Sequence, residues 1–219
     1  MKRSILGLFI ILSLGSIVEA ASYDFPQSTR FTQEKEVGMN KNERPKISVY
    51  IALSIDGYIA KQDGGLDWLD RVGGFDEDYG LQKLLASIDA LIIGRKTYDV
   101  ASTVPDPYPG KRVVVLSNSL TSVKGGMELY SGDLDELVMK LHREGIKHIW
   151  VDGGTTISQF LSRQLVDEMT LSIIPVVLGS GIPLFHGSDK EIPCRLISSQ
   201  SYRSGLVQMH YEIIRQFTK

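Results

Sequence analysis

Cysteine and histidine are scarce in this sequence of 219 residues. Its one cysteine, Cys194, excludes a disulfide within the chain and a cysteine-rich zinc site, and we expect it to lie in the packed interior. The four histidines, His142, His148, His186 and His210, lack the close spacing typical of zinc ligands. The sequence therefore predicts no metal site.

An excess of one charge is also missing. The chain has 24 Lys and Arg against 26 Asp and Glu, and no basic stretch is interleaved with aromatic residues. We therefore expect no nucleic-acid partner. Three familiar motifs are absent as well: G-x-G-x-x-G after a strand, G-x-x-x-x-G-K-[ST] and G-x-S-x-G. Their absence excludes the usual dinucleotide fingerprint, the phosphate loop and the hydrolase nucleophile elbow.

The first residues resemble a secretory signal peptide. Lys2 and Arg3 precede an apolar run over 5–18, and small residues follow at Ala20 and Ala21. We predict a signal peptide at 1–20, an exported protein (periplasmic or secreted) and no stable membrane span after cleavage, because the run is short for a span. An uncleaved anchor is one alternative. A start at Met39, which makes the protein cytoplasmic, is the other.

Residues 21–45 are polar and aperiodic, which predicts a disordered linker, and 46–219 then form one domain. Short apolar runs typical of buried strands alternate in the domain with segments of helical periodicity. The predicted strands are 47–54, 90–93, 112–116, 127–130 and 149–151. The predicted helices begin near 79, 133 and 155, and Asp133, with Glu136 three residues later, is the predicted cap of the second. The last third is richer in strands, at 168–178, 195–199 and 206–214. This order predicts a parallel core to which antiparallel strands are added.

Glycine and hydroxyl residues follow three of these strands, at 94–97, 117–118 and 153–156. The carboxyl ends of parallel strands meet at one edge of a sheet, so these residues should line one crevice. Glycines let a ligand approach the backbone closely, and helix N-termini attract anions. Arg95 and Lys96 add positive charge. Thr155 and Thr156 are placed to cap the following helix. The pattern favours a dinucleotide, although ordinary ligand-free turns remain an alternative at each position.

Asp56 lies at the carboxyl end of the first predicted strand, before a loop rich in glycine. It is a candidate active-site acid, and an Asp-Gly turn residue is an equally good interpretation. Trp68, further along the same loop, either shields the site from water or anchors the loop in the core.

The motifs in order resemble the dihydrofolate reductase-like superfamily, most closely the reductase domain of bacterial riboflavin biosynthesis. The resemblance covers the chain from about residue 46 to its end. The residues that carry it lie at 54–60, 78–80, 91–98, 114–117, 152–154 and 165–185.

This resemblance implies a three-layer α/β/α fold with a mostly parallel central sheet and antiparallel C-terminal strands. It also implies NADPH as cofactor, a small-molecule substrate and a homodimer. The implied contacts to the adenosine-side phosphates are Gly94, Arg95, Lys96 and Thr97, with Ser117 and Asn118 beside them. The implied contacts to the pyrophosphate, often across an unusual Gly-Gly peptide, are Gly153, Gly154, Thr155 and Thr156. Asp56 and its loop would close over nicotinamide and substrate.

Departures from the family patterns bear on the substrate. Trp68 follows Asp67 instead of a proline, which argues against folate, and no zinc deaminase motif is present. Asp152 stands where the riboflavin enzyme has a glutamate, so recognition of a ribosyl-pyrimidine phosphate stays open. Our hypothesis is an NADPH-dependent reductase of a small heterocyclic or ribosyl-pyrimidine-like substrate, with Asp56 catalytic and Asp56, Trp68 and Asp152 binding substrate. A non-catalytic nucleotide-binding protein, or a dihydrofolate reductase, is the alternative.

Overall fold

A computed structural model describes residues 44–75, 77–185 and 191–214. The predicted signal peptide and nearly all of the predicted linker lie outside these residues. Within the described ranges, no helix is long and apolar enough to cross a membrane.

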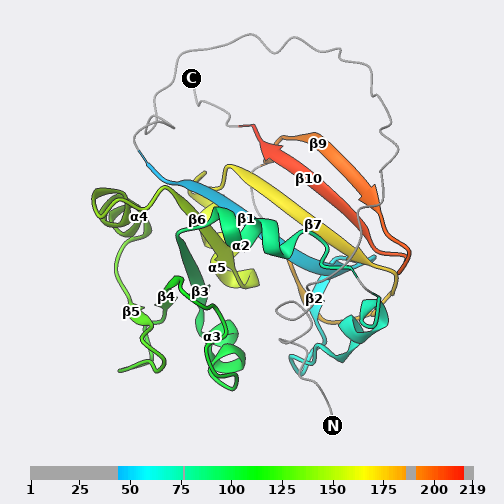
Figure 1. Ribbon diagram of the computed structural model, residues 1–219, viewed down its shortest axis with the longest axis horizontal. Coiled ribbons are helices and arrows are strands. Elements are labelled where there is room, and N and C mark those ends of the chain that lie inside the picture. The colour runs from blue at the N-terminus through cyan, green and yellow to red at the C-terminus, as the bar shows by residue number, and fades with distance from the viewer. Residues whose placement is uncertain (1–43, 76, 186–190, 215–219) are drawn as a thin grey trace.

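A single eight-stranded sheet organises the domain, in the order β5-β4-β3-β6-β1-β7-β10-β9 (Figure 1). Its strands are β1 (Lys46–Ser54), β3 (Ala90–Gly94), β4 (Arg112–Leu116), β5 (Glu128–Tyr130), β6 (His148–Asp152), β7 (Glu168–Ile174), β9 (Cys194–Ser201) and β10 (Val207–Ile213). The first six are mutually parallel, whereas β10 runs antiparallel to both β7 and β9. A separate pair joins β2 (Tyr58–Ala60) to β8 (Ile182–Pro183). The predicted parallel core with antiparallel C-terminal strands is confirmed.

Helices cover both faces of the sheet. They are α2 (Leu81–Ser87), α3 (Arg95–Ala101), α4 (Leu134–Arg143) and α5 (Gly154–Ser162), with a 3₁₀ helix η2 (Asp67–Val72). Alternate residues of a strand point to opposite faces. On β3, Ile92 packs in the core formed with α4 and α5, whereas Leu91 and Ile93 pack in the core formed with α2 and α3. Because the central strands are buried on both faces, they are apolar along their whole length, and the three-layer architecture is confirmed.

The starts of α4 and α5 show one correct and one wrong capping prediction. The Asp133 carboxylate accepts the backbone N–H groups of Asp135 (2.9 Å) and Glu136 (3.2 Å), as the sequence predicts. The cap of α5 is Gly153, without a side-chain hydrogen bond. Thr155 and Thr156 lie inside the first turn, so the prediction that they cap α5 is wrong.

Cys194 corrects another expectation. It lies on the edge strand β9, every residue of which is exposed. The sulfur is therefore not in the packed interior, because no element covers this edge within the described part of the chain.

Candidate functional site

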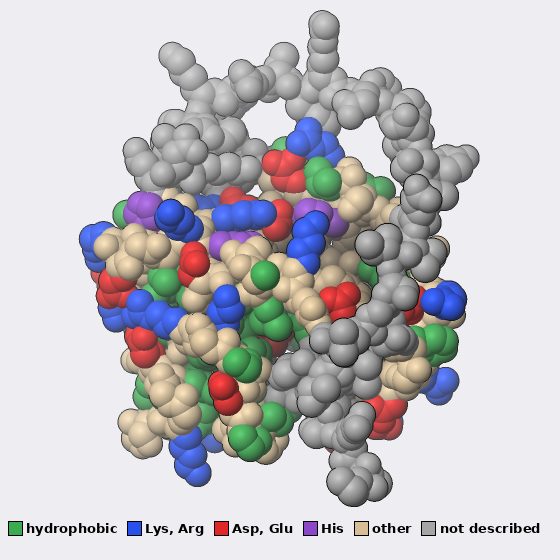
Figure 2. All heavy atoms as spheres, viewed as in Figure 1, with side chains coloured by type: hydrophobic (Ala, Val, Ile, Leu, Met, Phe, Trp, Pro, Cys, Tyr) green, Lys and Arg blue, Asp and Glu red, His purple; other side chains and the backbone are tan. Residues whose placement is uncertain are grey.

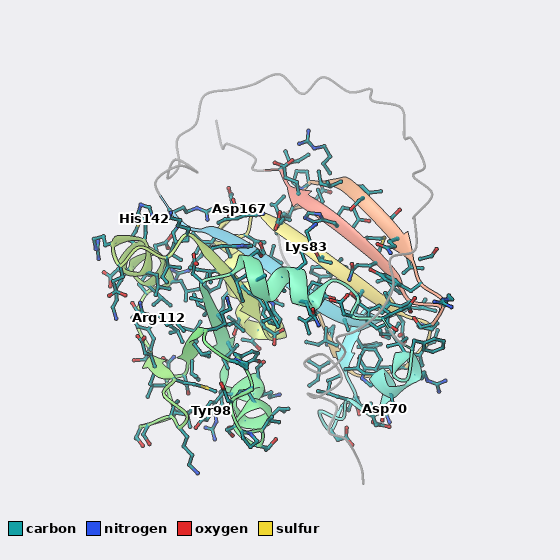
Figure 3. All side chains as sticks on the ribbon, in the orientation of Figure 1. Asp70, Lys83, Tyr98, Arg112, His142 and Asp167 are labelled. Atoms are coloured by element: carbon teal, nitrogen blue, oxygen red, sulfur yellow. The ribbon has the colours of Figure 1, made fainter. Side chains whose placement is uncertain are left out.

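A cavity of about 920 Å³ opens at the carboxyl ends of the parallel strands. In Figure 1 this is the lower edge of the sheet, with α3 on one side and the β2–η2 segment on the other. Figure 3 labels Tyr98 on α3 and Asp70 on η2 at these two sides. All ten residues predicted to hold a cofactor line the cavity: Gly94, Arg95, Lys96, Thr97, Ser117, Asn118, Gly153, Gly154, Thr155 and Thr156. The fold therefore brings together three strand ends that are far apart in the sequence.

Two glycines let the turns after β3 and β6 interlock. A Cβ on Gly94 would lie 2.6 Å from Thr156 Oγ1, and a Cβ on Gly153 would lie 2.7 Å from Thr97 Oγ1. Gly153 also has φ +95°, which side-chain-bearing residues rarely adopt, and its peptide bond to Gly154 is trans. Each glycine thus makes room for the threonine of the opposite turn, and any larger residue would push the two turns apart.

The N-terminus of α5 points its first N–H groups at this space. The first hydrogen bond within the helix runs from Ile157 N–H to Gly153 C=O (2.8 Å). The N–H groups of Gly154, Thr155 and Thr156 precede it, so the helix offers them no carbonyl partner. Together with the positive end of the helix dipole, they form a site for an anion such as a pyrophosphate.

Positive charge lies beside this helix end. The exposed Arg95 guanidinium donates to Ser119 Oγ (2.9 Å), and its Nε is 3.5 Å from the Asp99 carboxylate. Ser117 Oγ accepts the N–H groups of Ser119 (3.2 Å) and Leu120 (3.1 Å), which fixes this loop against Arg95. Lys96 is exposed and lines the cavity. This wall therefore presents two cations and ordered hydroxyls, the groups that bind phosphates.

Aromatic side chains form another wall of the cavity. Tyr50, Tyr108 and Trp150 pack edge to face, with ring centroids 6.3 Å (Tyr50–Trp150) and 6.1 Å (Tyr108–Trp150) apart. Burial raises the pKa of both tyrosines, so both phenols stay protonated. Sequence reasoning missed Tyr108, because the proline-rich loop 105–109 carries no periodicity. A lone aromatic residue among those prolines was the available signal.

Asp152 ends β6 beside this aromatic wall. It lies two residues after Trp150, so both side chains leave the strand on the same face and both line the cavity. Burial raises the pKa of Asp152 from 3.8 to about 6, and the N–H of Gly153 partly offsets this effect. The charge of Asp152 also raises the pKa of Tyr108, which shows that the two groups are close. The structure thus brings Asp152, a predicted substrate ligand, into the cavity in a form that gains or loses a proton near neutral pH.

The other two predicted substrate residues lie outside the cavity wall. The exposed Asp56 carboxylate accepts the N–H groups of Leu178 (3.1 Å) and Gly179 (2.7 Å). The Ser54 hydroxyl and these N–H groups hold the pKa of Asp56 below its ordinary value, so Asp56 stays ionised and carries no proton to donate. Trp68 is buried in the core beside η2. This geometry favours the turn interpretation for Asp56 and the core interpretation for Trp68.

Metal ligation has no support in the described ranges, where no cluster of three His, Cys, Asp or Glu side chains could hold an ion. The sheet order, the two helical layers and the cavity at the strand ends define the protein as an α/β protein of the dihydrofolate reductase-like class.

Residues 45–208 match the RibD C-terminal domain model, and the chain belongs to this family. YwjB of Bacillus subtilis, an uncharacterized protein, is 35% identical over 170 residues, which cover 76% of this chain and 97% of YwjB. The crystal structure of a protein from Shewanella sp. PV-4 with a provisional riboflavin-biosynthesis name has a TM-score of 0.73 at 36% identity, covering 78% of this chain and 99% of that one. A shorter match is 39% identical over 59 residues, 26% of each chain. It is to the 2,5-diamino-6-ribosylamino-4(3H)-pyrimidinone 5′-phosphate reductase of Aquifex aeolicus.

Proposed function

We propose that this protein is an NADPH-dependent reductase that transfers a hydride to a small heterocyclic substrate. The observation that carries the proposal is a single cavity with two kinds of wall. One wall holds a helix N-terminus and cations, and the other holds aromatic rings and an acid. The Aquifex relative is named as a pyrimidine reductase, which supports a pyrimidine-like ring as the substrate class.

The residues present fit a dinucleotide. The α5 N-terminus, with Gly153 and Gly154, would hold the pyrophosphate, because the interlocked turns leave N–H groups open to the cavity. Arg95 and Lys96, with Ser117, would hold the phosphate on the adenosine ribose. When bound, NADPH supplies the hydride, and the protein provides position and environment.

The chain's own contribution lies on the aromatic wall. Tyr50, Tyr108 and Trp150 would orient a planar ring and exclude water from it. Asp152 would hold the proton that the reduced ring takes up, because burial raises its pKa to about 6. Asp56 lies outside the cavity wall and is held ionised in its turn, so we do not assign it this role.

The test compares NADPH with NADH, which differ by one phosphate. Replacing Arg95 and Lys96 by alanine should weaken NADPH binding about ten-fold or more, because a charge-assisted hydrogen bond contributes roughly 1.5–3 kcal/mol. NADH binding should change little. Cofactor fluorescence titration at fixed salt measures both affinities.

A matched control removes the same charges elsewhere. Arg71 and Lys83 are exposed and do not line the cavity; Figure 3 labels Lys83 on α2. Their double alanine variant should bind both cofactors like the unmodified protein. If Arg95 and Lys96 contact the shared pyrophosphate instead, the first variant will lose both cofactors equally. Failure of the unmodified protein to bind either cofactor would refute the proposed function.

A further inference from the structure

Three cations line the cavity among the described residues, and none of them lies on β1, β2, η2 or α2. The Lys and Arg residues that line it are Arg95 and Lys96 on α3 and Arg163 just after α5. Arg163 is already paired with the carboxylates of Asp133 (2.5 Å) and Asp135 (3.0 Å). Arg95 and Lys96 flank the strand ends and the α5 N-terminus where the cofactor phosphates would lie, whereas Arg163 lies at the C-terminal end of α5.

The opposite wall has no cationic side chain among the described residues that line the cavity. β1, β2, η2 and α2 contribute apolar groups there, including Ala52, Ile59, Leu69, Leu81 and Leu85. A phosphate placed against this wall would lose its hydration and gain no cation in return, which is strongly unfavourable. The pyrimidine phosphate in the name of the Aquifex relative carries such a group.

When it is ionised, above about pH 6, Asp152 adds a negative charge to the same region. Burial raises its pKa, the Gly153 N–H partly offsets this rise, and no cation among the described residues lowers the pKa further. A carboxylate in this situation gains most from a ligand that brings N–H donors or positive charge. It would repel a ligand phosphate instead.

We propose that the substrate is a planar heterocycle without a phosphate group, neutral or positively charged, whose N–H groups pair with Asp152 while its ring packs against Tyr50, Tyr108 and Trp150. This inference rests on the proposed function and narrows its substrate class. The observation that carries it is that, among the described residues, no cation lines the wall formed by β1, β2, η2 and α2.

Calorimetry on the protein saturated with NADP⁺ tests the inference with three probes. They are 2,4-diaminopyrimidine, the riboside 2,5-diamino-6-ribosylamino-4(3H)-pyrimidinone, and the 5′-phosphate of that riboside. We expect the first two to bind, and the riboside to bind at least about ten-fold more tightly than its phosphate. Asp152→Asn should weaken 2,4-diaminopyrimidine about ten-fold or more, the equivalent of one charge-assisted hydrogen bond. Asp56→Asn, which changes an acid outside the cavity, should leave that affinity unchanged.

A second pair of variants tests the wall directly. Leu85 lines the cavity, whereas its neighbour Leu84 on the same helix does not, and both are half-buried. Leu85→Lys supplies the missing cation and should tighten binding of the riboside phosphate by about ten-fold, and Leu84→Lys should not. Because both variants add the same charge to the same helix, a difference between them reports the cavity and not the net charge.

Three results would overturn the inference. They are phosphate binding as tight as that of the riboside, an Asp152→Asn variant with unchanged affinity for 2,4-diaminopyrimidine, or an NADP⁺ complex that binds neither unphosphorylated probe. In each case the proposed function survives, because NADP⁺ binding is measured first. Failure to bind NADP⁺ would instead refute the proposed function and this inference together.

Discussion

The carboxyl group of Asp152 should make the folded protein less stable as pH rises. In the folded state burial raises its pKa to about 6, whereas in the unfolded chain it returns to about 3.8. Between these values the folded state binds more protons than the unfolded state, so the free energy of unfolding falls with rising pH. The loss is complete above the folded pKa. Asp152→Asn removes the titration and keeps a side chain of similar shape.

The size of the effect follows from the two pKa values. One pKa unit corresponds to about 1.4 kcal/mol, so a rise from 3.8 to about 6 amounts to about 3 kcal/mol at pH 8. At pH 4.5 the carboxyl is largely ionised in the unfolded chain but still protonated in the folded protein. The same relation then gives a destabilisation of only about 1 kcal/mol, because pH 4.5 is close to the unfolded pKa. The asparagine variant should therefore be more stable than the unmodified protein, and its advantage should grow by about 2 kcal/mol between pH 4.5 and pH 8.

Urea unfolding at several pH values measures this difference, with the slope checked for constancy. Asp56→Asn is a control of opposite sign. Because hydrogen bonds lower the pKa of Asp56, its charge stabilises the fold above the unfolded pKa, and that contribution disappears as pH falls. The reasoning fails if Asp152→Asn is no more stable at pH 8, or if its advantage does not depend on pH.

Three further predictions concern other parts of the chain. Gly94→Ala should destabilise the fold by about 1–3 kcal/mol in urea unfolding, because the new Cβ would lie 2.6 Å from Thr156 Oγ1. Adding Thr156→Ala should restore most of the lost stability, and additive effects of the two substitutions would contradict this explanation. We also predict a homodimer, and the exposed edge strand β9, where Ile197 is 51% exposed, is the candidate surface. The protein should elute at twice the chain mass at micromolar concentration, and a monomer peak would count against the dimer. If the protein is exported, mass spectrometry of the native protein should find Ala21 at the N-terminus, whereas a chain that starts at Met39 would rule out export.

The sequence predicts structural features well where the interactions that determine them involve residues close together in the chain. Buried parallel strands must be apolar along their length, so β1, β3, β4 and β6 could be predicted within one or two residues. The capping aspartate of α4 could be predicted because its partners are two and three residues away. The convergence of the three cofactor segments could also be predicted, because the carboxyl ends of parallel strands share one edge.

Tertiary structure decided which acid faces the cavity. Asp56 and Asp152 both follow an apolar strand, and nothing near them in the sequence separates their roles. Asp56 meets N–H groups at 178 and 179, whereas Asp152 is buried near Tyr108. The pKa of a carboxyl depends on burial and on the groups around it, and these come from segments remote in the chain.

Tertiary packing also produces the interlocked turns and the cavity wall on which the described residues place no cation. The sequence shows glycines at 94 and 153, but only packing shows that each makes room for a threonine about 60 residues away in the chain. The sequence also gives a balanced net charge, and Figure 2 shows both signs interspersed on one face. Which charges reach the cavity is set by helix orientation and loop path, because a side chain's surroundings are fixed only when the layers pack together.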